Sequence, residues 1–491
     1  MPIKSPIAVY WFKRDLRLLD NPGLQQALNA DIPLLLVYIF EPILETDIHY
    51  HTRHFNFIKQ SLVALNNELK KYNTKVYCVH GDVVSVLSKI NAIWSIKTLY
   101  SMEETGLEIT YNRDKNVKKW CNSVHVTWRE HQNNGVIRGL SNRKNWRNMW
   151  NDYMMNPIMP FTATSSHFIN PEKQFPLEEV ALKPKILEGI QAGGTTKGLA
   201  YLDSFLNIRH EKYQQSISKP EAARLHCGRV SPYIAWGNLS VRYVWQRAKH
   251  AKTLGASAFQ INAFTSRLRW QAHFIQKFEM EGNMEFKSVN AGYHNLKKPL
   301  NSAFINAWET GTTGYPLVDA CMRCVVATGY LNFRMRAMVV SFFTHHLWQP
   351  WQKGAAFLAR QFLDFEPGIH YPQFQMQSGE TGINMLRIYN PTKNANEHDS
   401  EGKFIRKWVP ELAHLPTAFV IEPWNMTQLE QEGYDCVLGK EYPKPIIQLK
   451  ETYKYASTIL WSMKGKSSVR KESKRILARH TLPNRSKILD Q

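Results

Sequence analysis

The stretch PLLLVYIF, residues 33–40, decides the fold of the first part of the chain. It is almost wholly apolar and rich in branched side chains, as a strand buried on both faces of a parallel sheet should be. Shorter runs of the same kind lie at residues 7–12, 75–80, 97–101 and 124–128. We expect each of these runs to form a strand.

Helical patterns separate the expected strands, most clearly at residues 56–72, where apolar residues recur at helical spacing. Strands that alternate with helices predict an α/β domain with a doubly wound, Rossmann-like parallel sheet. Such sheets bind ligands at the carboxyl ends of their strands. The sequence has no GxGxxG or P-loop pattern, so it does not predict the usual dinucleotide or ATP clamp.

The second half of the chain changes to long amphipathic helical runs, at residues 241–252, 259–280, 316–328, 334–348 and 355–365. The stretch that joins the halves is polar and rich in Asn, Pro, Gly and Lys, as in a connector packed over a surface. The predicted organisation is an α/β domain at 1–132, a connector at 133–200, an all-α domain at 201–463 and a basic C-terminal tail at 464–491. The tail is either solvated or an arm that contacts phosphates.

Composition narrows the class of partner. The chain has 491 residues, a formal net charge of +21, and 43% hydrophobic and 12% aromatic residues, so it can bury a large core. The excess of positive charge favours a polyanion: DNA, RNA or an acidic membrane surface. Because no signal peptide and no membrane-length apolar stretch are evident, we expect a cytoplasmic protein that does not span a membrane.

The six cysteines do not form a disulfide framework in a chain of this length. Cys321 and Cys324 form a CxxC pattern inside an apolar helical run, and no second CxxC follows. Core cysteines are the favoured interpretation; a zinc or iron–sulfur site is the less favoured alternative. We therefore predict no metal.

Three long motifs occur in order: WFKRDLRLLDNPGL (11–24), AWETGTTGYPLVDACMRCVVATGYLNFRMR (307–336) and RIYNPTKNANEHDSEGKFIRKWVPEL (387–412), followed by EPW at 422–424. With this order and spacing, the chain resembles the photolyase/cryptochrome family over nearly its whole length. The resemblance implies an N-terminal antenna domain and a helical domain that binds FAD. It also implies a light-driven electron transfer from reduced flavin to a pyrimidine dimer in DNA, or light signalling.

Several positions match the family's FAD site. Arg336 and Asp364 resemble an ion pair beside the flavin ring, where the arginine would stabilise an anionic reduced flavin. Glu366 stands where the family usually has a second Asp. His370 falls at the position facing flavin N5, where it would donate a hydrogen bond or a proton; a histidine in a surface loop is the alternative. The remaining residues implied for FAD are Tyr213, Cys227, Gly228, Arg229, Val230, Ser231 and Gln271.

The family photoreduces its flavin along three tryptophans, and this chain matches two of them. Trp308 and Trp351 occupy the outer positions, while the position next to the flavin is Phe374. Phenylalanine is much harder to oxidise, so we expect slow photoreduction or a different route. The other aromatic residues considered for that route are Trp348, Tyr330 and Tyr371, and ordinary core packing is the alternative for all of these rings.

The lesion pocket departs most from the family. Trp270 resembles a ring on which a flipped base stacks. Arg267 replaces the glutamate of enzymes that repair cyclobutane dimers, and Phe333 and Met376 replace an asparagine and a second stacking tryptophan. The histidine expected of pyrimidine–pyrimidone enzymes appears as Asn332. The pocket thus matches neither main repair class.

Three functions remain open at this stage. The first is a photolyase acting on UV-damaged DNA, single-stranded DNA included; the second is a photoreceptor of cryptochrome type without repair. The third, outside the family, is a nucleotide-binding α/β enzyme fused to a helical RNA-binding domain. We expect FAD as cofactor, a second antenna chromophore of unidentified type and a monomer.

Overall fold

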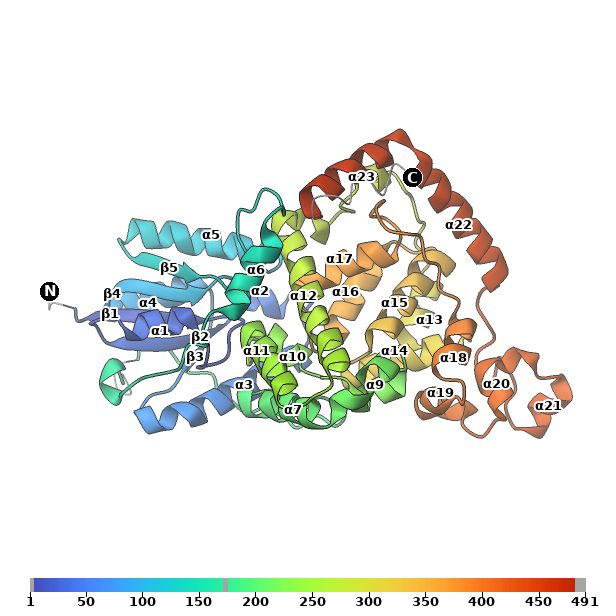
Figure 1. Cartoon of the computed structure of the whole chain (residues 1–491), viewed down its shortest axis with the longest axis horizontal. Helices are drawn as coiled ribbons and strands as arrows, with labels where there is room; N and C mark the ends of the chain where they lie inside the picture. Colours follow the sequence, from blue (N-terminus) through green and yellow to red (C-terminus); the bar gives the residue numbers. More distant parts are fainter. Residues whose placement is uncertain (1–3, 171–174, 482–491) are drawn as a thin grey trace.

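The computed structural model describes residues 4–170 and 175–481. The first part is a sheet of five parallel strands in the order β3-β2-β1-β4-β5 (Figure 1). The strands are β1 (Pro6–Phe12), β2 (Leu34–Phe40), β3 (Tyr77–His80), β4 (Ser95–Met102) and β5 (Thr127–His131). The predicted doubly wound sheet is confirmed, and every residue of β2 is buried.

Helices cover both faces of this sheet. They are α1 (Pro22–Leu28), α3 (Thr52–Leu69), α4 (Val83–Ile93) and α5 (Glu108–Ser123). Because side chains alternate along a strand, Ala8, Tyr10 and Phe12 of β1 enter the large core shared with the helical part. Ile7, Val9 and Trp11 enter a separate core on the opposite face of the sheet. This explains why the strand sequences are apolar rather than alternating.

The connector contains a helix that was not predicted from the sequence, α6 (Trp146–Met155). The connector is polar overall, but in this helix Trp146, Trp150 and Met154 recur at a spacing of four and are buried. That spacing puts the three side chains on one face. The helix α7 (Thr195–Asn207) then begins inside the segment assigned to the connector.

The C-terminal part is helical, as predicted. The elements that surround the site are α12 (Ala258–Met280), α14 (Pro316–Thr328), α15 (Phe333–Ser341), α16 (Trp351–Gln361) and α17 (Pro367–Gln377). The bounds of α14 equal the predicted ones because proline starts it and Gly329, with φ +70°, ends it. The predicted helix 334–348 is broken, since a short π-helix at Phe342–His346 follows α15.

Buried ionic contacts join the two parts of the chain. Asp20 accepts hydrogen bonds from Arg242 and from the hydroxyl of Ser240. Burial alone would raise the pKa of Asp20, but these hydrogen bonds outweigh it and lower the pKa. Nearby, Gly237 has φ +77°, and a Cβ there would lie 2.2 Å from the carbonyl oxygen of Arg14. Only glycine therefore permits this approach of the backbones.

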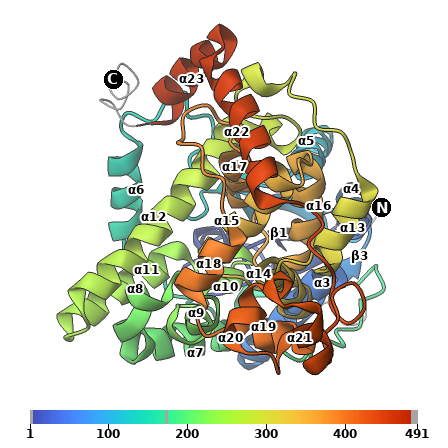
Figure 2. The same cartoon turned by 90° about the vertical axis from the view of Figure 1, so that its right-hand side faces the viewer.

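Two helices, α22 (Leu449–Gly465) and α23 (Ser467–His480), form an arm along the edge of the helical part (Figures 1 and 2). The segment assigned to a basic tail is thus helical as far as it is described, and residues 482–491 lie outside the described residues. The helix α23 buries Val469, Ile476 and Leu477. Within the described residues, no helix combines the length and apolar character needed to cross a membrane.

One carboxylate fastens the end of α23 to the end of α12. Glu281 accepts hydrogen bonds from Nε2 of His480 at 2.8 Å and from Nη1 of Arg475 at 2.6 Å. Burial alone would raise the pKa of Glu281, but the hydrogen bonds outweigh it and lower the pKa to about 2. This depressed pKa indicates that the ionised carboxylate stabilises the folded state.

We predict that the contribution of Glu281 fades in acid. An unfolded glutamate titrates near pH 4.3, so the stabilisation is complete above that pH and is lost as the pH falls towards 2. Glu281→Gln should lower the free energy of unfolding by about 2–3 kcal/mol at pH 7, and by less at pH 3. Urea denaturation at both pH values measures this. The exposed Glu451→Gln is the control. A loss of stability equal at both pH values would contradict the assignment.

Candidate functional site

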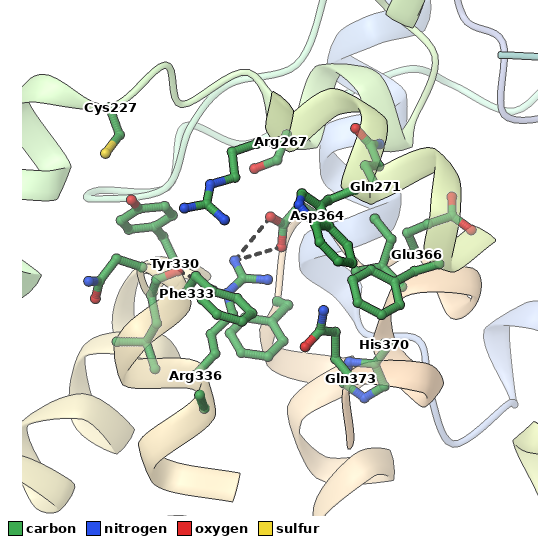
Figure 3. Close-up of a pocket in the computed structure, with 18 of the residues that line it drawn as sticks. Cys227, Arg267, Gln271, Tyr330, Phe333, Arg336, Asp364, Glu366, His370 and Gln373 are labelled. Atoms are coloured by element: carbon green, nitrogen blue, oxygen red, sulfur yellow. Dashed lines mark hydrogen bonds and ion pairs between the residues drawn. The ribbon is translucent and has the colours of Figure 1, made fainter. Parts of the chain in front are cut away.

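A cavity of about 620 Å³ lies between α12, α15, α17 and the loop at 227–231 (Figure 3). This volume is within the range of ligand pockets, roughly 300–1,000 Å³. Trp270 and Phe333 line it and are 45% and 49% exposed, so the cavity reaches the surface. Its lining brings together all the residues that the sequence assigned to cofactor or DNA contact: Tyr213, Cys227, Gly228, Arg229, Val230, Ser231, Arg267, Trp270, Gln271, Phe333, Arg336, Asp364, Glu366, His370, Phe374 and Met376.

The Arg336–Asp364 pair lies in the cavity wall. Nη2 of Arg336 donates to both carboxylate oxygens of Asp364, each at 3.0 Å, and Nε donates to the carbonyl of Leu331 at 2.8 Å. The guanidinium lies over the ring of Phe362, 3.9 Å from its centroid. These contacts fix the plane of the guanidinium. Among the described residues Nη1 has no acceptor, which leaves it available to an anionic ligand.

The loop before the short helix α10 (Ser231–Ala235) forms the opposite wall. Arg229 stacks on Tyr330 with 3.8 Å between guanidinium carbon and ring centroid, and donates to Gln191 at 2.7 Å. Gly228 leaves room for the ring of Phe264, which a Cβ would approach to 3.0 Å. Burial raises the pKa of the Cys227 thiol to about 12, so this side chain is a neutral part of the wall.

The lining fits a dinucleotide with an anionic centre and large rings. Arg229, Arg267 and Arg336 supply cations for a pyrophosphate, and apolar side chains cover most of the remaining wall. Among the described residues, Nε of Arg229, Oδ1 of Asn332 and Oε1 of Gln373 are buried without a hydrogen-bond partner. Buried polar groups of this kind are normally satisfied, so they suit a ligand that carries both donors and acceptors.

The helix α17 positions the residues beneath the cavity. Pro367 occupies its first turn, and the carboxylate of Glu366 accepts a hydrogen bond from the backbone N–H of Gly368 at 3.3 Å. Pro367 and Gly368 thus form the start of a helix. Glu366 also lies 3.6 Å from Nη2 of Arg14, from the first part of the chain. Burial raises the pKa of Glu366, although Arg14 opposes this.

His370 is a buried residue of the cavity wall and not a surface-loop histidine. Its Nε2 lies 2.8 Å from the carbonyl oxygen of Ala355, so this nitrogen carries the hydrogen and donates it. Burial lowers the pKa of His370 to about 3, which keeps the ring neutral at physiological pH. Nδ1 is therefore an acceptor. The expectation that His370 donates a hydrogen bond or proton to the flavin does not fit this tautomer.

The two predicted outer tryptophans do not line the cavity. Trp308 is fully buried and its Nε1 donates to the carbonyl of Val339 at 3.1 Å; Trp351 is 1% exposed and donates to Ser288 at 3.1 Å. Phe374 lines the cavity and lies 4.8 Å from His370 between ring centroids. Tyr371 packs against Trp351, with centroids 6.0 Å apart.

The other aromatic residues considered for electron transfer lie in different places. Tyr330 lines the cavity, whereas Trp348 belongs to a separate cluster with Tyr455. Among the aromatic residues left open, Tyr330 and Tyr371 therefore lie at or next to the cavity.

Cys321 and Cys324 are buried in α14, and the described residues include no group of three His, Cys, Asp or Glu side chains arranged to hold a metal.

Several residues near the cavity were not predicted from the sequence. Gln373 lies three residues after His370 on α17 and lines the same wall, so helical periodicity was a usable signal. Arg14, Asp47 and His49 come from the first part of the chain and reach α17 only through the tertiary fold. No local pattern marks them.

The carboxyl ends of the strands carry a buried cluster of charges. Arg113 donates to Glu41 at 2.8 Å and to Glu104 at 2.7 Å, and also pairs with Asp114. Its guanidinium lies 4.9 Å from the ring centroid of Trp11. Burial raises the pKa of Glu41 to about 7, despite the neighbouring arginine. At this edge, where a parallel sheet commonly binds ligands, the charged side chains bond to one another.

Comparisons with known proteins agree with this arrangement. Residues 8–143 match the family described as DNA photolyase, and residues 264–462 match the family described as FAD binding domain of DNA photolyase. A cryptochrome DASH of Synechocystis sp. is 24% identical, covering 91% of this chain and 96% of its own. A deoxyribodipyrimidine photo-lyase of Alkalihalophilus pseudofirmus is 23% identical, with the same coverage. The solved structure of a class III photolyase from Agrobacterium tumefaciens has a TM-score of 0.82 at 23% identity, covering 95% of this chain and 99% of its own, and so has the same fold.

We predict that Asp364→Asn weakens both the fold and FAD retention. The neutral amide leaves the Arg336 cation without its bidentate partner, which should cost about 1.5–3 kcal/mol of unfolding free energy in the flavin-free protein. Urea denaturation and the flavin released per polypeptide measure the two effects. The exposed Asp31→Asn is the matched control. Unchanged stability and flavin content would show that the pair has no such role.

Proposed function

The chain belongs to the photolyase/cryptochrome family and carries its FAD-binding domain, and from this premise we propose that it is a blue-light-dependent DNA photolyase. In this proposal bound, reduced FAD would supply an electron to a UV-induced pyrimidine dimer, and the electron would return to the flavin once the dimer has split. One observation carries the proposal. A single cavity joins the Arg336–Asp364 pair to an aromatic mouth at the surface, so a base turned out of DNA would enter the space next to the flavin.

The mouth is suited to stacking. Trp270 lies nearly parallel to Phe274, with centroids 5.9 Å apart and 28° between the ring planes, and it remains 45% exposed. Phe333 is exposed to a similar degree and also lines the cavity. Stacking of a base on an aromatic ring contributes about 1–3 kcal/mol. Two half-exposed rings therefore compensate for Met376, which stands where the family has a second stacking tryptophan.

Arg267 gives the lesion pocket its own chemistry. Its side chain projects into the cavity from α12, as Figure 3 shows. A guanidinium only donates hydrogen bonds, whereas the glutamate that it replaces only accepts them when ionised. Pyrimidine rings carry carbonyl oxygens, which accept. We infer that Arg267 binds these oxygens or a neighbouring phosphate, in single-stranded or duplex DNA.

The arm formed by α22 and α23 supports a DNA partner. Its exposed cations make no ion pairs within the described residues, and they are Lys450, Lys454, Lys466, Arg470, Lys471 and Lys474. The end of α23 is fastened to the end of α12, the helix that carries Trp270. Trp270 lies ten residues before the end of α12, or about 15 Å along its axis. DNA that enters the mouth is thus within reach of the arm.

A photoreceptor of cryptochrome type, without repair, is the second candidate. Arg267 and Met376 favour it because both depart from the lesion pocket of the repair enzymes that the chain resembles. The two functions share the flavin and the light reaction. They differ in whether a bound dimer is split, so a repair assay separates them.

We predict light-dependent repair by the purified flavoprotein. With its FAD reduced, it should split cyclobutane dimers in single-stranded or duplex oligonucleotides under blue light and not in darkness, as measured by chromatography of the products. Trp270→Ala should weaken binding of the damaged DNA by about 5–150-fold, because the variant has no ring on which the base can stack. Phe259→Ala removes an exposed ring from the same helix and is the control. Bound, photoreducible flavin without repair would favour the photoreceptor.

We also predict that the arm contributes to the salt dependence of DNA binding. Replacing Arg470, Lys471 and Lys474 by Gln should lower the slope of log affinity against log salt by about 0.9 for each DNA phosphate that the arm no longer neutralises. The exposed lysines 115, 118 and 119 of α5, changed to Gln, form a control with the same change of charge in the α/β part of the molecule (Figure 1). Equal slopes for the two triple variants would show that the arm does not contact DNA phosphates.

A further inference from the structure

Three side chains form a buried hydrogen-bonded chain where the first part of the molecule meets α17. The hydroxyl of Tyr371 is hydrogen-bonded to Nε2 of His49, and Nδ1 of His49 lies 2.7 Å from a carboxylate oxygen of Asp47. Tyr371 and His49 are 3% and 5% exposed. Asp47 and His49 precede α3, so this phenol of the helical part has its base on the other part of the chain.

The hydrogen-bond pattern fixes the direction in which a proton can move. The same oxygen of Asp47 also accepts a hydrogen bond from the backbone N–H of His49 at 2.9 Å. This oxygen is therefore an acceptor toward Nδ1 as well. Nδ1 of His49 therefore carries the ring hydrogen and donates it to Asp47. In the neutral form of the ring Nε2 then carries the lone pair, and the phenolic O–H of Tyr371 donates to it.

Tyr371 lies one side chain behind the cavity wall. Its ring centroid is 5.8 Å from that of His370, which lines the cavity. His49 is stacked on Phe365, another lining residue, at 5.8 Å and 2°. Phe374 occupies the position where the family has its flavin-proximal tryptophan. The oxidisable ring nearest to that position on α17 is therefore Tyr371, one turn earlier.

A buried phenol loses an electron readily only if its proton leaves at the same time. Burial raises the pKa of Tyr371 well above its usual value, so the group is protonated before any oxidation. A phenol radical that kept its proton would be a cation in an apolar site, which is costly. A lone pair already hydrogen-bonded to the phenol removes this cost, because the proton moves along the existing bond.

We propose that Tyr371, His49 and Asp47 form a proton-coupled redox relay that reduces the light-excited, oxidised flavin. The proposal rests on the proposed light-driven function. Tyr371 gives one electron to the flavin while its O–H bond breaks and an N–H bond forms at Nε2 of His49. The products on the protein are a neutral tyrosyl radical and an imidazolium, whose charge the carboxylate of Asp47 balances.

In the relay the residue that is left oxidised is a tyrosine with its own base, whereas in a chain of tryptophans it is an indole. Trp351 is edge-on to Tyr371, with centroids 6.0 Å apart and 77° between the ring planes, but it is 1% exposed, and Trp308 is fully buried. Neither indole has a carboxylate or imidazole acceptor, since their N–H groups donate to a serine hydroxyl and a backbone carbonyl. The tyrosine alone among these three rings has a built-in base.

The proton arrangement can be tested without flavin. In flavin-free protein labelled with ¹⁵N-histidine, NMR should show His49 neutral and protonated at Nδ1. Tyr371→Phe should shift its Nε2 resonance and leave the tautomer unchanged. A His49 protonated at Nε2, or an Nε2 resonance insensitive to Tyr371→Phe, would overturn the relay.

The electron step is tested in FAD-loaded protein under blue light. Electron paramagnetic resonance should detect a neutral tyrosyl radical in the wild type, and Tyr371→Phe should abolish it. His49→Gln keeps an acceptor but not a base, so photoreduction should slow by about 100-fold and lose its dependence on D₂O. Tyr293→Phe, which removes a buried phenol outside both the cavity and the relay, should leave radical and rate unchanged.

The outcomes separate the relay from the function on which it rests. The relay would be overturned if the Tyr371→Phe variant retains its FAD and is photoreduced at the wild-type rate. A radical of tryptophan type in the wild type would also overturn it. Both results would leave the photolyase proposal standing. Wild-type protein that binds no FAD would refute the proposed function instead, while the NMR result would still report the hydrogen-bonded chain.

Discussion

The site depends on one contact across the two parts of the chain, between Arg14 and the start of α17. The guanidinium of Arg14 donates to the carbonyl of Phe365, lies 3.6 Å from Glu366 and stacks over Trp236 at 4.6 Å. Glu366 in turn caps α17. Because a helix is a rigid element, fixing its first turn also fixes the residues one and two turns later. Arg14 therefore determines the positions of His370, Tyr371 and Phe374, although it lies more than 350 residues earlier in the chain.

Much of the fold was predictable because local signals and burial agree. The run 33–40 is buried at every residue of β2, and proline and glycine bound α14 where the sequence places them. The failures have equally local causes. The helix α6 lies in a connector that is polar overall, where three buried side chains at a spacing of four are a short signal. The helix expected at 334–348 is broken by a π-helix.

The lining of the candidate site was predictable by family resemblance, but its chemistry was not. Matching motifs placed Arg336 and Asp364, which the structure holds 3.0 Å apart, in the wall of one cavity. The protonation of His370 depends on a carbonyl of α16, and the partners of Tyr371 belong to a loop of the α/β part. Hydrogen-bond partners brought together by tertiary packing leave no trace in a local sequence pattern.

The arrangement separates the two kinds of chemistry that such a cavity would need. At the mouth, exposed rings and Arg267 offer stacking and hydrogen-bond donors, which suit a nucleobase and not an acid–base reaction. In and behind the wall formed by α17, the groups that can exchange protons are buried: His370 is held neutral by burial, and His49 lies between a phenol and a carboxylate. Water would compete for both hydrogen bonds of His49, so the burial of His49 keeps it hydrogen-bonded to the phenol of Tyr371. The same boundary that fixes α17 thus also holds the base that is hydrogen-bonded to Tyr371.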